Sequence, residues 1–221
     1  MKTSIARKIL MALSGFFLLL FLLQHLLINS MSVVSEHSFN SVSHFMGTNT
    51  VVQFVLQPVL AFGVLFHLSL GMYLESQNRK ARNKKYNTNH AATNSTWMSR
   101  NMIITGIMVM LFLGLHFYDF WIPEIKTKYI DSNMSGLNEF GMPRYWEELH
   151  AKFADVVRVI LYCLAFIFLS LHLMHGFQSA FQSVGFRHGK YTPIVKRLGD
   201  IYAVLVPLGF IIIAVYHYVT Q

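Results

Sequence analysis

The stretch ILMALSGFFLLLFLLQHLLI, residues 9–28, decides the class of this protein. It holds 20 residues without a charge, about the length an α-helix needs to cross the hydrocarbon core of a membrane. It follows Lys2, Arg7 and Lys8, as a signal peptide would. However, it is longer than the apolar core of a signal peptide, and no small-x-small cleavage site follows it. We therefore interpret it as a retained membrane-spanning helix.

Four more apolar runs of similar length follow, and the five runs together occupy most of the chain. The sequence has 221 residues, of which 54% are hydrophobic and 13% charged, and its mean hydropathy is +0.44. This composition is typical of a polytopic membrane protein and leaves few residues for a soluble domain. We predict an all-α protein in which residues 1–221 form one transmembrane domain, with spans at approximately 9–30, 51–76, 100–121, 152–182 and 198–219.

The basic residues are concentrated in alternate connections, and this asymmetry predicts the orientation. Of the 18 Lys and Arg residues, 13 precede the first span or lie in the second and fourth connections. The first connection has none, and the third carries carboxylates, Asp119 among them. By the positive-inside rule, the N-terminus is cytoplasmic and the C-terminus lies outside. The basic run at residues 79–85 could also bind nucleic acid, but between two spans it is better explained by topology and lipid headgroups.

A histidine lies within each of four predicted spans, and these residues are the strongest functional signal. Ionisable side chains inside a membrane are costly and mark functional sites by default. From the rise of an α-helix, His25 and His116 lie toward the outside, and His67 and His172 lie toward the cytoplasm. Depth therefore pairs His25 with His116 and His67 with His172. Two neutral imidazoles are the axial ligand set of a low-spin, electron-carrying haem.

Several residues of this hypothesis have plainer alternatives. A single membrane histidine more often joins helices by a hydrogen bond than ligates a metal, but the matched depths favour ligation. Cys163 is the only cysteine, which excludes an intramolecular disulfide and a C-x-x-C-H haem attachment, so haem would be b-type. Arg158 could neutralise propionates of the outer haem, snorkel outward or pair with Asp155. The remaining histidines, His150 and His217 among them, are expected to be solvated or interfacial.

Small and polar residues beside the inner histidines predict further haem contacts. Gly63 and Gly71 lie one turn before and after His67, where they would clear space for a flat macrocycle. Small residues in membrane helices also serve helix packing, which is the alternative for each glycine. His175 shares a helical face with His172 and could either replace it as the ligand or contact a propionate.

A set of short motifs extends through the chain in order. It comprises Gln24-His25-Leu26 with Asn29, Phe39-Asn40-Ser41 followed by His44-Phe45-Met46, His67 with Gly71-Met72-Tyr73, His116, and His172 with Gly176 and Ser179-Ala180-Phe181. These motifs resemble the single-chain dihaem cytochrome b subunit of succinate:quinone oxidoreductases, in its b558 subfamily. The resemblance implies two haems b, the outer one ligated by His25 and His116 and the inner one by His67 and His172.

The resemblance also implies partners and a location. The chain would anchor a flavoprotein carrying covalent FAD and an iron–sulfur protein on the cytoplasmic face of a bacterial cytoplasmic membrane, and the whole complex can form a dimer. Electrons would pass through the inner and then the outer haem to a quinone, commonly menaquinone. The sequence contains no nucleophile triad and no phosphate-binding glycine loop, so the dicarboxylate chemistry is expected on the partner subunits.

The quinone site is expected at the outer ends of the spans and in the first connection. Asn29, Asn40, His44 and Gln53 can hydrogen-bond a quinone carbonyl, although each is also an ordinary loop or capping residue. Some dihaem fumarate reductases carry a transmembrane glutamate where this chain has Ser170. Because we find no other carboxylate deep within a span, we predict no compensating proton pathway and favour succinate oxidation.

Two other classes fit some of the same observations. The cytochrome b anchor of a hydrogenase or formate dehydrogenase also uses transmembrane histidines, but the motifs and the five-span order fit it less well. A metal or proton transporter can place histidines in its spans as well. Transporters usually contain internal repeats and broken helices, and we detect neither in the sequence.

Overall fold

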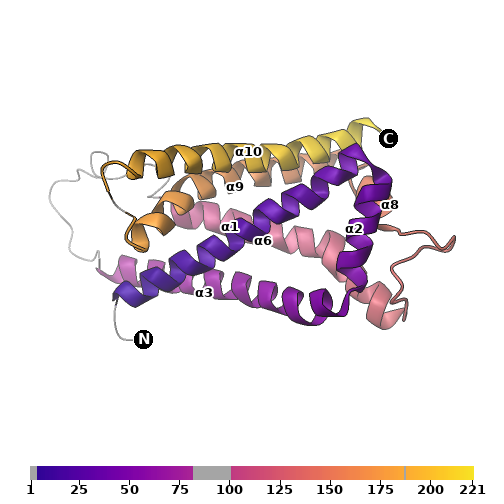
Figure 1. Ribbon diagram of the computed structural model, residues 1–221, viewed down its shortest axis with the longest axis horizontal. Coiled ribbons are helices and arrows are strands. Elements are labelled where there is room, and N and C mark those ends of the chain that lie inside the picture. The colour runs from indigo at the N-terminus through magenta and orange to yellow at the C-terminus, as the bar shows by residue number, and fades with distance from the viewer. Residues whose placement is uncertain (1–3, 82–100, 187) are drawn as a thin grey trace.

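The computed structural model describes residues 4–81, 101–186 and 188–221, and the regular elements in this part of the chain are all helical. Figure 1 shows them as a bundle of long helices with shorter helices at one end. In chain order they are α1 Ser4–Val34, α2 Glu36–Thr48, η1 Val52–Leu56, α3 Gln57–Ala81, α6 Met102–His116, η2 Phe117–Trp121, α7 Ile122–Ile125, η3 Lys126–Ile130, α8 Tyr145–Lys152, α9 Val156–Ser183 and α10 Thr192–Val219.

Five helical segments are long and apolar enough to cross a membrane. They are Ser4–Val34, Val52–Lys80, Met102–Ile130, Val156–Ser183 and Thr192–Val219. The prediction of an all-α membrane protein with five spans is therefore confirmed. The start of α1 and the end of α10 lie at opposite ends of the bundle, as an odd number of crossings requires (Figure 1). Which end faces the cytoplasm stays a prediction.

The ends of two spans differ from those expected from the sequence. The third helical run continues to Ile130, beyond the predicted end at residue 121. Its last part contains π-helical turns, and Glu124 and Lys128 form an ion pair with each other there. The predicted start of the fourth span, at residue 152, falls at the end of the separate helix α8. Helix α9 begins after Asp155, whose side chain accepts a hydrogen bond from the Val157 backbone N–H.

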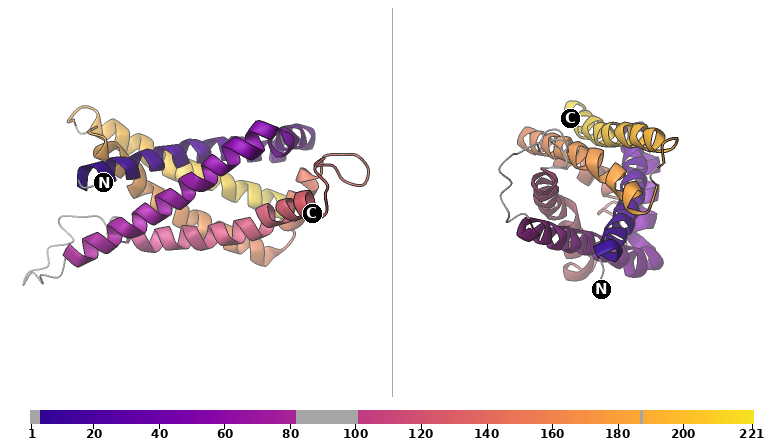
Figure 2. Two further views of the ribbon diagram at one scale, coloured as in Figure 1. Left: turned by 90° about the horizontal axis from the view of Figure 1, so that it is seen from below. Right: turned by 90° about the vertical axis from the view of Figure 1, so that its left-hand side faces the viewer.

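The core of the bundle lies between α9 and α10, against which α1 and α6 pack. The ring of Phe166 stacks on that of Phe210 with centroids 5.2 Å apart, and Ala203 and Ala214 on α10 are almost wholly buried. Small residues allow helices to approach closely in the absence of a hydrophobic driving force. Seen end-on, the long helices surround a common axis (Figure 2, right), and α3 packs mainly on α1.

One end of the bundle is covered by α2, α8 and the connection at residues 131–144, which we call the cap (Figure 1). The backbone N–H of Trp146 donates to Asn40 Oδ1 at 2.9 Å, and Trp146 Nε1 donates to the Ser32 carbonyl at 2.9 Å. These bonds join α8 to α2 and to the end of α1. The cap lies at the end of the bundle that the charge pattern predicts to be outside.

Candidate functional site

The outer histidine pair is formed by helices α1 and α6. His25 and His116 have ring centroids 5.9 Å apart with their planes at 89°. An imidazole nitrogen ligates a first-row metal ion at about 2 Å, so two rings on opposite sides of one ion have centroids roughly 6 Å apart. The spacing of the two rings therefore fits axial ligation of a haem iron. Elsewhere in the described residues, no group of three or more His, Cys, Asp or Glu side chains forms a protein-only metal site.

Aromatic rings surround this outer pair. Phe21 stacks on His25 with centroids 5.3 Å apart, and Phe112 lies 5.8 Å from His116. Phe210 and Phe120 complete the enclosure, at 5.7 Å from His25 and 5.3 Å from His116. Such walls suit the face of a macrocycle and exclude water. They supply no hydrogen-bond acceptor to either imidazole.

Polar support for the outer imidazoles is sparse. His116 Nδ1 is buried and has no hydrogen-bond partner among the described residues. The Asn29 side-chain nitrogen lies 3.5 Å from both ring nitrogens of His25, a long contact, while it donates a 2.8 Å bond to the His25 carbonyl. Asn29 therefore uses one of its two N–H donors on the helix backbone, and its contact with a quinone stays a prediction.

The inner histidine pair is formed by α3 and α9. The structure brings the rings of the outer pair together, and the pairing of His67 with His172 stays a prediction. Ser14 Oγ on α1 lies 2.9 Å from His67 Nδ1, and Thr105 Oγ1 on α6 lies 3.4 Å from His172 Nδ1. Each inner imidazole thus faces a hydroxyl from a neighbouring helix, unlike either outer imidazole.

The glycines named for haem clearance lie in different surroundings. A Cβ on Gly63 would overlap the ring of Phe17, so this glycine lets α1 pack closely on α3, as the packing alternative requires. A Cβ on Gly71 would meet only the flexible end of Met11, at 3.4 Å. Haem clearance therefore stays a prediction for both glycines, and at Gly63 the structure also shows the packing alternative. His175 is near enough to His172 to interact electrostatically, and its role as ligand or propionate contact remains a prediction.

Arg158 pairs with a carboxylate that the sequence analysis misplaced. Its Nε lies 3.2 Å from Asp119 Oδ2, and the Tyr162 hydroxyl donates to the same oxygen at 2.9 Å. Asp155, the partner considered from sequence, caps α9 instead. The Asp119 side chain is 0% exposed, and its Oδ1 has no hydrogen-bond partner among the described residues.

The position of Asp119 corrects the sequence analysis. It lies within the helical run Met102–Ile130, one turn beyond His116, and not in a solvated connection. Asp119 is thus a buried carboxylate of this helical run, and the absence of a compensating proton pathway stays a prediction. The signal available in the sequence was the spacing, because residues three apart on a helix share a face and His116 was already assigned as a ligand.

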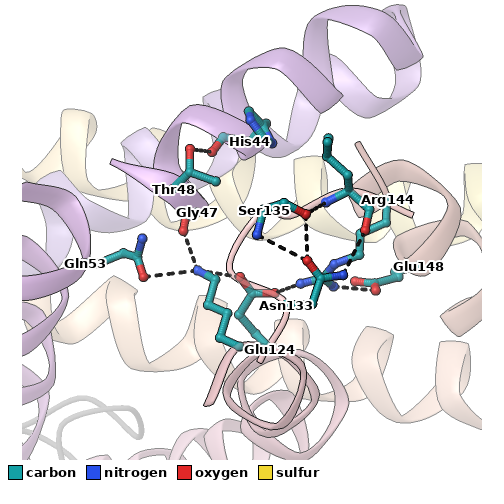
Figure 3. A network of polar contacts seen from close by, with 11 residues as sticks. His44, Gly47, Thr48, Gln53, Glu124, Asn133, Ser135, Arg144 and Glu148 are labelled. Carbon is teal, nitrogen blue, oxygen red and sulfur yellow. Dashed lines mark hydrogen bonds and ion pairs between the residues drawn. The ribbon is translucent and has the colours of Figure 1, made fainter. Parts of the chain in front are cut away.

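Two of the four quinone candidates lie at the cap end of the bundle, Gln53 within a polar network and His44 beside it (Figure 3). Lys128, which is 4% exposed, donates to Gln53 Oε1 at 3.3 Å and to the Gly47 carbonyl, and it pairs with Glu124 at 2.7 Å. The third candidate, Asn40, is buried and accepts the Trp146 N–H, which is a structural role.

Glu124 is the centre of this network because it pairs with two buried cations, Lys128 and Arg144. Arg144 also pairs with Glu148. Burial alone would lower the pKa of Arg144, but its hydrogen bonds and charge interactions with Glu148 and Glu124 outweigh burial and raise that pKa. The arginine is therefore permanently charged, and both carboxylates stabilise its charged form.

A second polar spot beside this network lacks partners. His44 Nδ1 and the Tyr145 hydroxyl are both buried without a hydrogen bond among the described residues, and their rings lie 6.5 Å apart. Glycines at positions 47 and 136 border the Tyr145 hydroxyl, where a Cβ would collide with it. Burial, followed by the negative charge of Glu124, raises the pKa of Tyr145 to about 12.

His150 and His217 also differ from the sequence expectation, since His217 is 0% exposed. Their Nδ1 atoms lie 3.1 Å apart, and His217 Nε2 lies 2.9 Å from Ser32 Oγ. Ser32 Oγ donates its proton to the Asn29 carbonyl, so it accepts from His217. These side chains join α8, α10 and α1 at the cap end of the bundle. The sequence does not show which residues of other helices contact a histidine near the end of a span.

No family model and no solved structure matches the chain. The chain is similar to the succinate dehydrogenase cytochrome b558 subunit of Bacillus subtilis (strain 168), with 26% identity over 101 residues. The match covers 45% of this chain and 46% of that protein, so it spans slightly less than half of each. The similarity supports the resemblance carried by the histidine motifs.

Proposed function

We propose that this chain is the membrane anchor and dihaem cytochrome b subunit of a succinate:quinone oxidoreductase in a bacterial cytoplasmic membrane. The observation that carries the proposal is the arrangement of four histidines on four spanning helices, in which the rings of His25 and His116 face each other while His67 and His172 each face a hydroxyl of a neighbouring helix. The similarity to a succinate dehydrogenase cytochrome b558 subunit supports it independently. A histidine-bearing transporter would have no reason to space two imidazoles as axial ligands.

Under this proposal, His25 with His116 and His67 with His172 would hold two haems b. Haem bound at these levels supplies one-electron transfer between the iron–sulfur partner and a quinone. The protein holds the four imidazoles on rigid helices, encloses the outer pair with aromatic rings and hydrogen-bonds the inner pair. The partners are a flavoprotein and an iron–sulfur protein on the cytoplasmic face, where the dicarboxylate chemistry takes place.

The quinone, by preference menaquinone, would bind near the outer pair. Of the four residues considered from sequence, His44 has a buried nitrogen free of partners, and the hydroxyl of Tyr145 beside it is equally free among the described residues. Two adjacent polar atoms that lack partners suit a carbonyl or hydroxyl of a bound molecule. Gln53, in contrast, is already engaged by Lys128.

The test is haem quantitation in purified complexes carrying single histidine substitutions. Reduced-minus-oxidised spectra and pyridine haemochrome assays should give two haems b per chain in the parent. His25→Ala should lose only the outer haem and His67→Ala only the inner haem. His37→Ala, on the exposed surface of α2, is the matched control and should keep both. A parent chain that copurifies without haem would overturn the proposal, as would loss of the same haem in both variants.

A further inference from the structure

A pattern of five residue types occurs twice in the chain, once in α1 and once in α6. It reads Met-x2-Ser/Thr-Gly-x5-Phe-x3-His and occupies residues 11–25 and 102–116. The sequence analysis found no internal repeat because the residues between these positions are interchangeable apolar types. In each copy the final histidine is an outer ligand candidate, and the phenylalanine four residues before it packs on that imidazole.

The first half of the pattern makes equivalent contacts in both copies. Ser14 Oγ donates to the Met11 carbonyl at 2.9 Å, and Thr105 Oγ1 donates to the Met102 carbonyl at 3.0 Å. Each hydroxyl oxygen then faces the Nδ1 atom of an inner histidine, at 2.9 Å for Ser14 and 3.4 Å for Thr105.

The glycine after each hydroxyl residue lies beside the same imidazole. A Cβ on Gly15 would lie 3.9 Å from His67 Cε1, and a Cβ on Gly106 would lie 3.5 Å from His172 Cε1, both ordinary van der Waals contacts. The hydroxyl and the glycine together therefore form one contact surface for an imidazole edge, repeated on two helices.

The hydrogen-bond directions fix the protonation of the inner rings. A serine or threonine hydroxyl has one proton, and both hydroxyls donate it to their own helix. The oxygen can then only accept from an imidazole N–H, so Nδ1 carries the proton and Nε2 presents its lone pair. That is the tautomer in which Nε2 can ligate a metal.

We propose that Ser14 and Thr105 are positioning residues that hold the two inner-haem ligands as Nδ1-protonated imidazoles and strengthen them as electron donors. The inference rests on the proposed dihaem function. An acceptor on the far ring nitrogen raises ligand basicity and fixes the ring plane. A more basic ligand favours ferric over ferrous iron, so these hydroxyls lower the reduction potential of the inner haem.

The same helices serve both haem levels. Each hydroxyl residue stands 11 positions before an outer histidine, from Ser14 to His25 and from Thr105 to His116. Eleven residues make three turns, so both side chains lie on one helix face about 16 Å apart. Helices α1 and α6 therefore carry the outer ligand candidates and also the hydroxyls that face the inner ones. Helices α3 and α9 carry the inner ligand candidates.

The experiment measures both haem potentials in the purified complex by redox titration, together with the EPR spectrum of the oxidised low-spin haems. Thr105→Val keeps the side-chain shape without the acceptor, and Thr105→Ser restores the hydroxyl. Ser14→Ala removes the other acceptor. Ser183→Ala is the matched control, because Ser183 Oγ donates only to the Ser179 carbonyl of its own helix.

We expect Thr105→Val and Ser14→Ala to shift the ferrous/ferric equilibrium of the inner haem about tenfold toward ferrous iron, a rise of about 59 mV. The effect of Ser14→Ala should be the larger because its oxygen lies closer to the ring. The inner-haem EPR signal should change, and Thr105→Ser should return both readouts toward the parent.

Loss of the inner haem alone from Thr105→Val, with retention in Thr105→Ser, would also support the inference. Unchanged potentials and EPR signals in both acceptor variants that retain two haems would overturn it and leave the dihaem function standing. A parent chain without haem would instead overturn the proposed function itself, so the two failures are distinguishable.

Discussion

The inner and outer histidine pairs use the same side chain but different supports. Each inner imidazole faces a hydroxyl on an adjacent spanning helix, whereas each outer imidazole is packed against phenylalanine rings, and His116 Nδ1 has no partner among the described residues. A hydrogen bond to the far ring nitrogen orients an imidazole, whereas aromatic rings only confine it. The inner imidazoles are therefore oriented by hydroxyls of neighbouring spanning helices, and the outer imidazoles are held by packing.

The outer level, in contrast, lies next to buried charge and to the cap. Asp119 and Arg158 form an ion pair one turn beyond His116, and the Glu124 network lies further along the same helical run. If the chain holds the two proposed haems, perturbing these charges should affect the outer haem and spare the inner one.

The largest effect is expected for Glu124→Gln. This change leaves the buried cations Lys128 and Arg144, whose side chains are 3% and 8% exposed, without their shared carboxylate. Breaking a buried ion pair costs about 3 kcal/mol or more. We expect a loss of that size in the free energy of unfolding in detergent, with the outer haem released before the inner one on heating.

The control for Glu124→Gln is Glu75→Gln. Glu75 pairs with Arg79 four residues later, and the Arg79 side chain is 67% exposed. An exposed helical pair contributes only about 0.3 to 0.5 kcal/mol. Simultaneous release of both haems from the Glu124→Gln protein would contradict the separate support of the two levels.

A smaller effect is expected for Asp119→Asn, which keeps the side-chain shape but removes the negative charge from Arg158. We expect a loss of about 2 kcal/mol in the free energy of unfolding, less than for Glu124 because the Arg158 side chain is 23% exposed. Removing a negative charge beside the outer haem disfavours ferric iron. Redox titration should therefore show a higher potential for the outer haem and an unchanged potential for the inner one.

Asp155→Asn is the matched control for Asp119→Asn. Asp155 caps α9 through its side-chain oxygen, a role that asparagine fills equally well. We expect both haem potentials to be unchanged. The unfolding free energy should stay within about 0.5 kcal/mol of that of the parent. A rise in the inner potential of Asp119→Asn equal to that of the outer would show that the buried charge acts on both levels.

The sequence predicted the parts of this comparison that depend on periodicity and depth. Apolar runs of spanning length gave the five helices, and helical rise paired the four histidines, because both follow from regular geometry. The sequence analysis placed Asp119 in a connection because a charged residue near the end of an apolar run usually marks the end of a span. It missed Ser14 and Thr105 because an isolated hydroxyl in an apolar helix carries no signal until its partner on another helix is known.

Contacts between segments distant in sequence account for the other misses. His217 was expected to be solvated, yet Ser32 and His150 provide its partners from α1 and α8. Gly63 was assigned to haem clearance, and the structure also shows the ring of Phe17 packed beside it. In both cases the local pattern does not show the tertiary neighbour.

The smallest effect at neutral pH is expected for Tyr145→Phe. The Tyr145 hydroxyl has no hydrogen-bond partner among the described residues, so its removal should change the free energy of unfolding by less than about 0.5 kcal/mol. If the hydroxyl instead binds a quinone, Tyr145→Phe should slow quinone reduction and leave both haem potentials unchanged. A loss of stability above about 1 kcal/mol at pH 8 would contradict a hydroxyl without a protein partner.

Alkaline pH turns this small effect into a measurable one. In the folded protein the pKa of Tyr145 is about 12, against about 10 for an unfolded tyrosine. Because the folded state holds the proton more tightly, the stability linked to Tyr145 is complete below pH 10 and is lost as the pH rises toward 12. The parent should therefore lose roughly 1 kcal/mol more than Tyr145→Phe in this range, after allowance for the partial exposure of the ring. The exposed Tyr129→Phe is the control, and its unfolding midpoints at pH 8 and pH 11 should follow those of the parent.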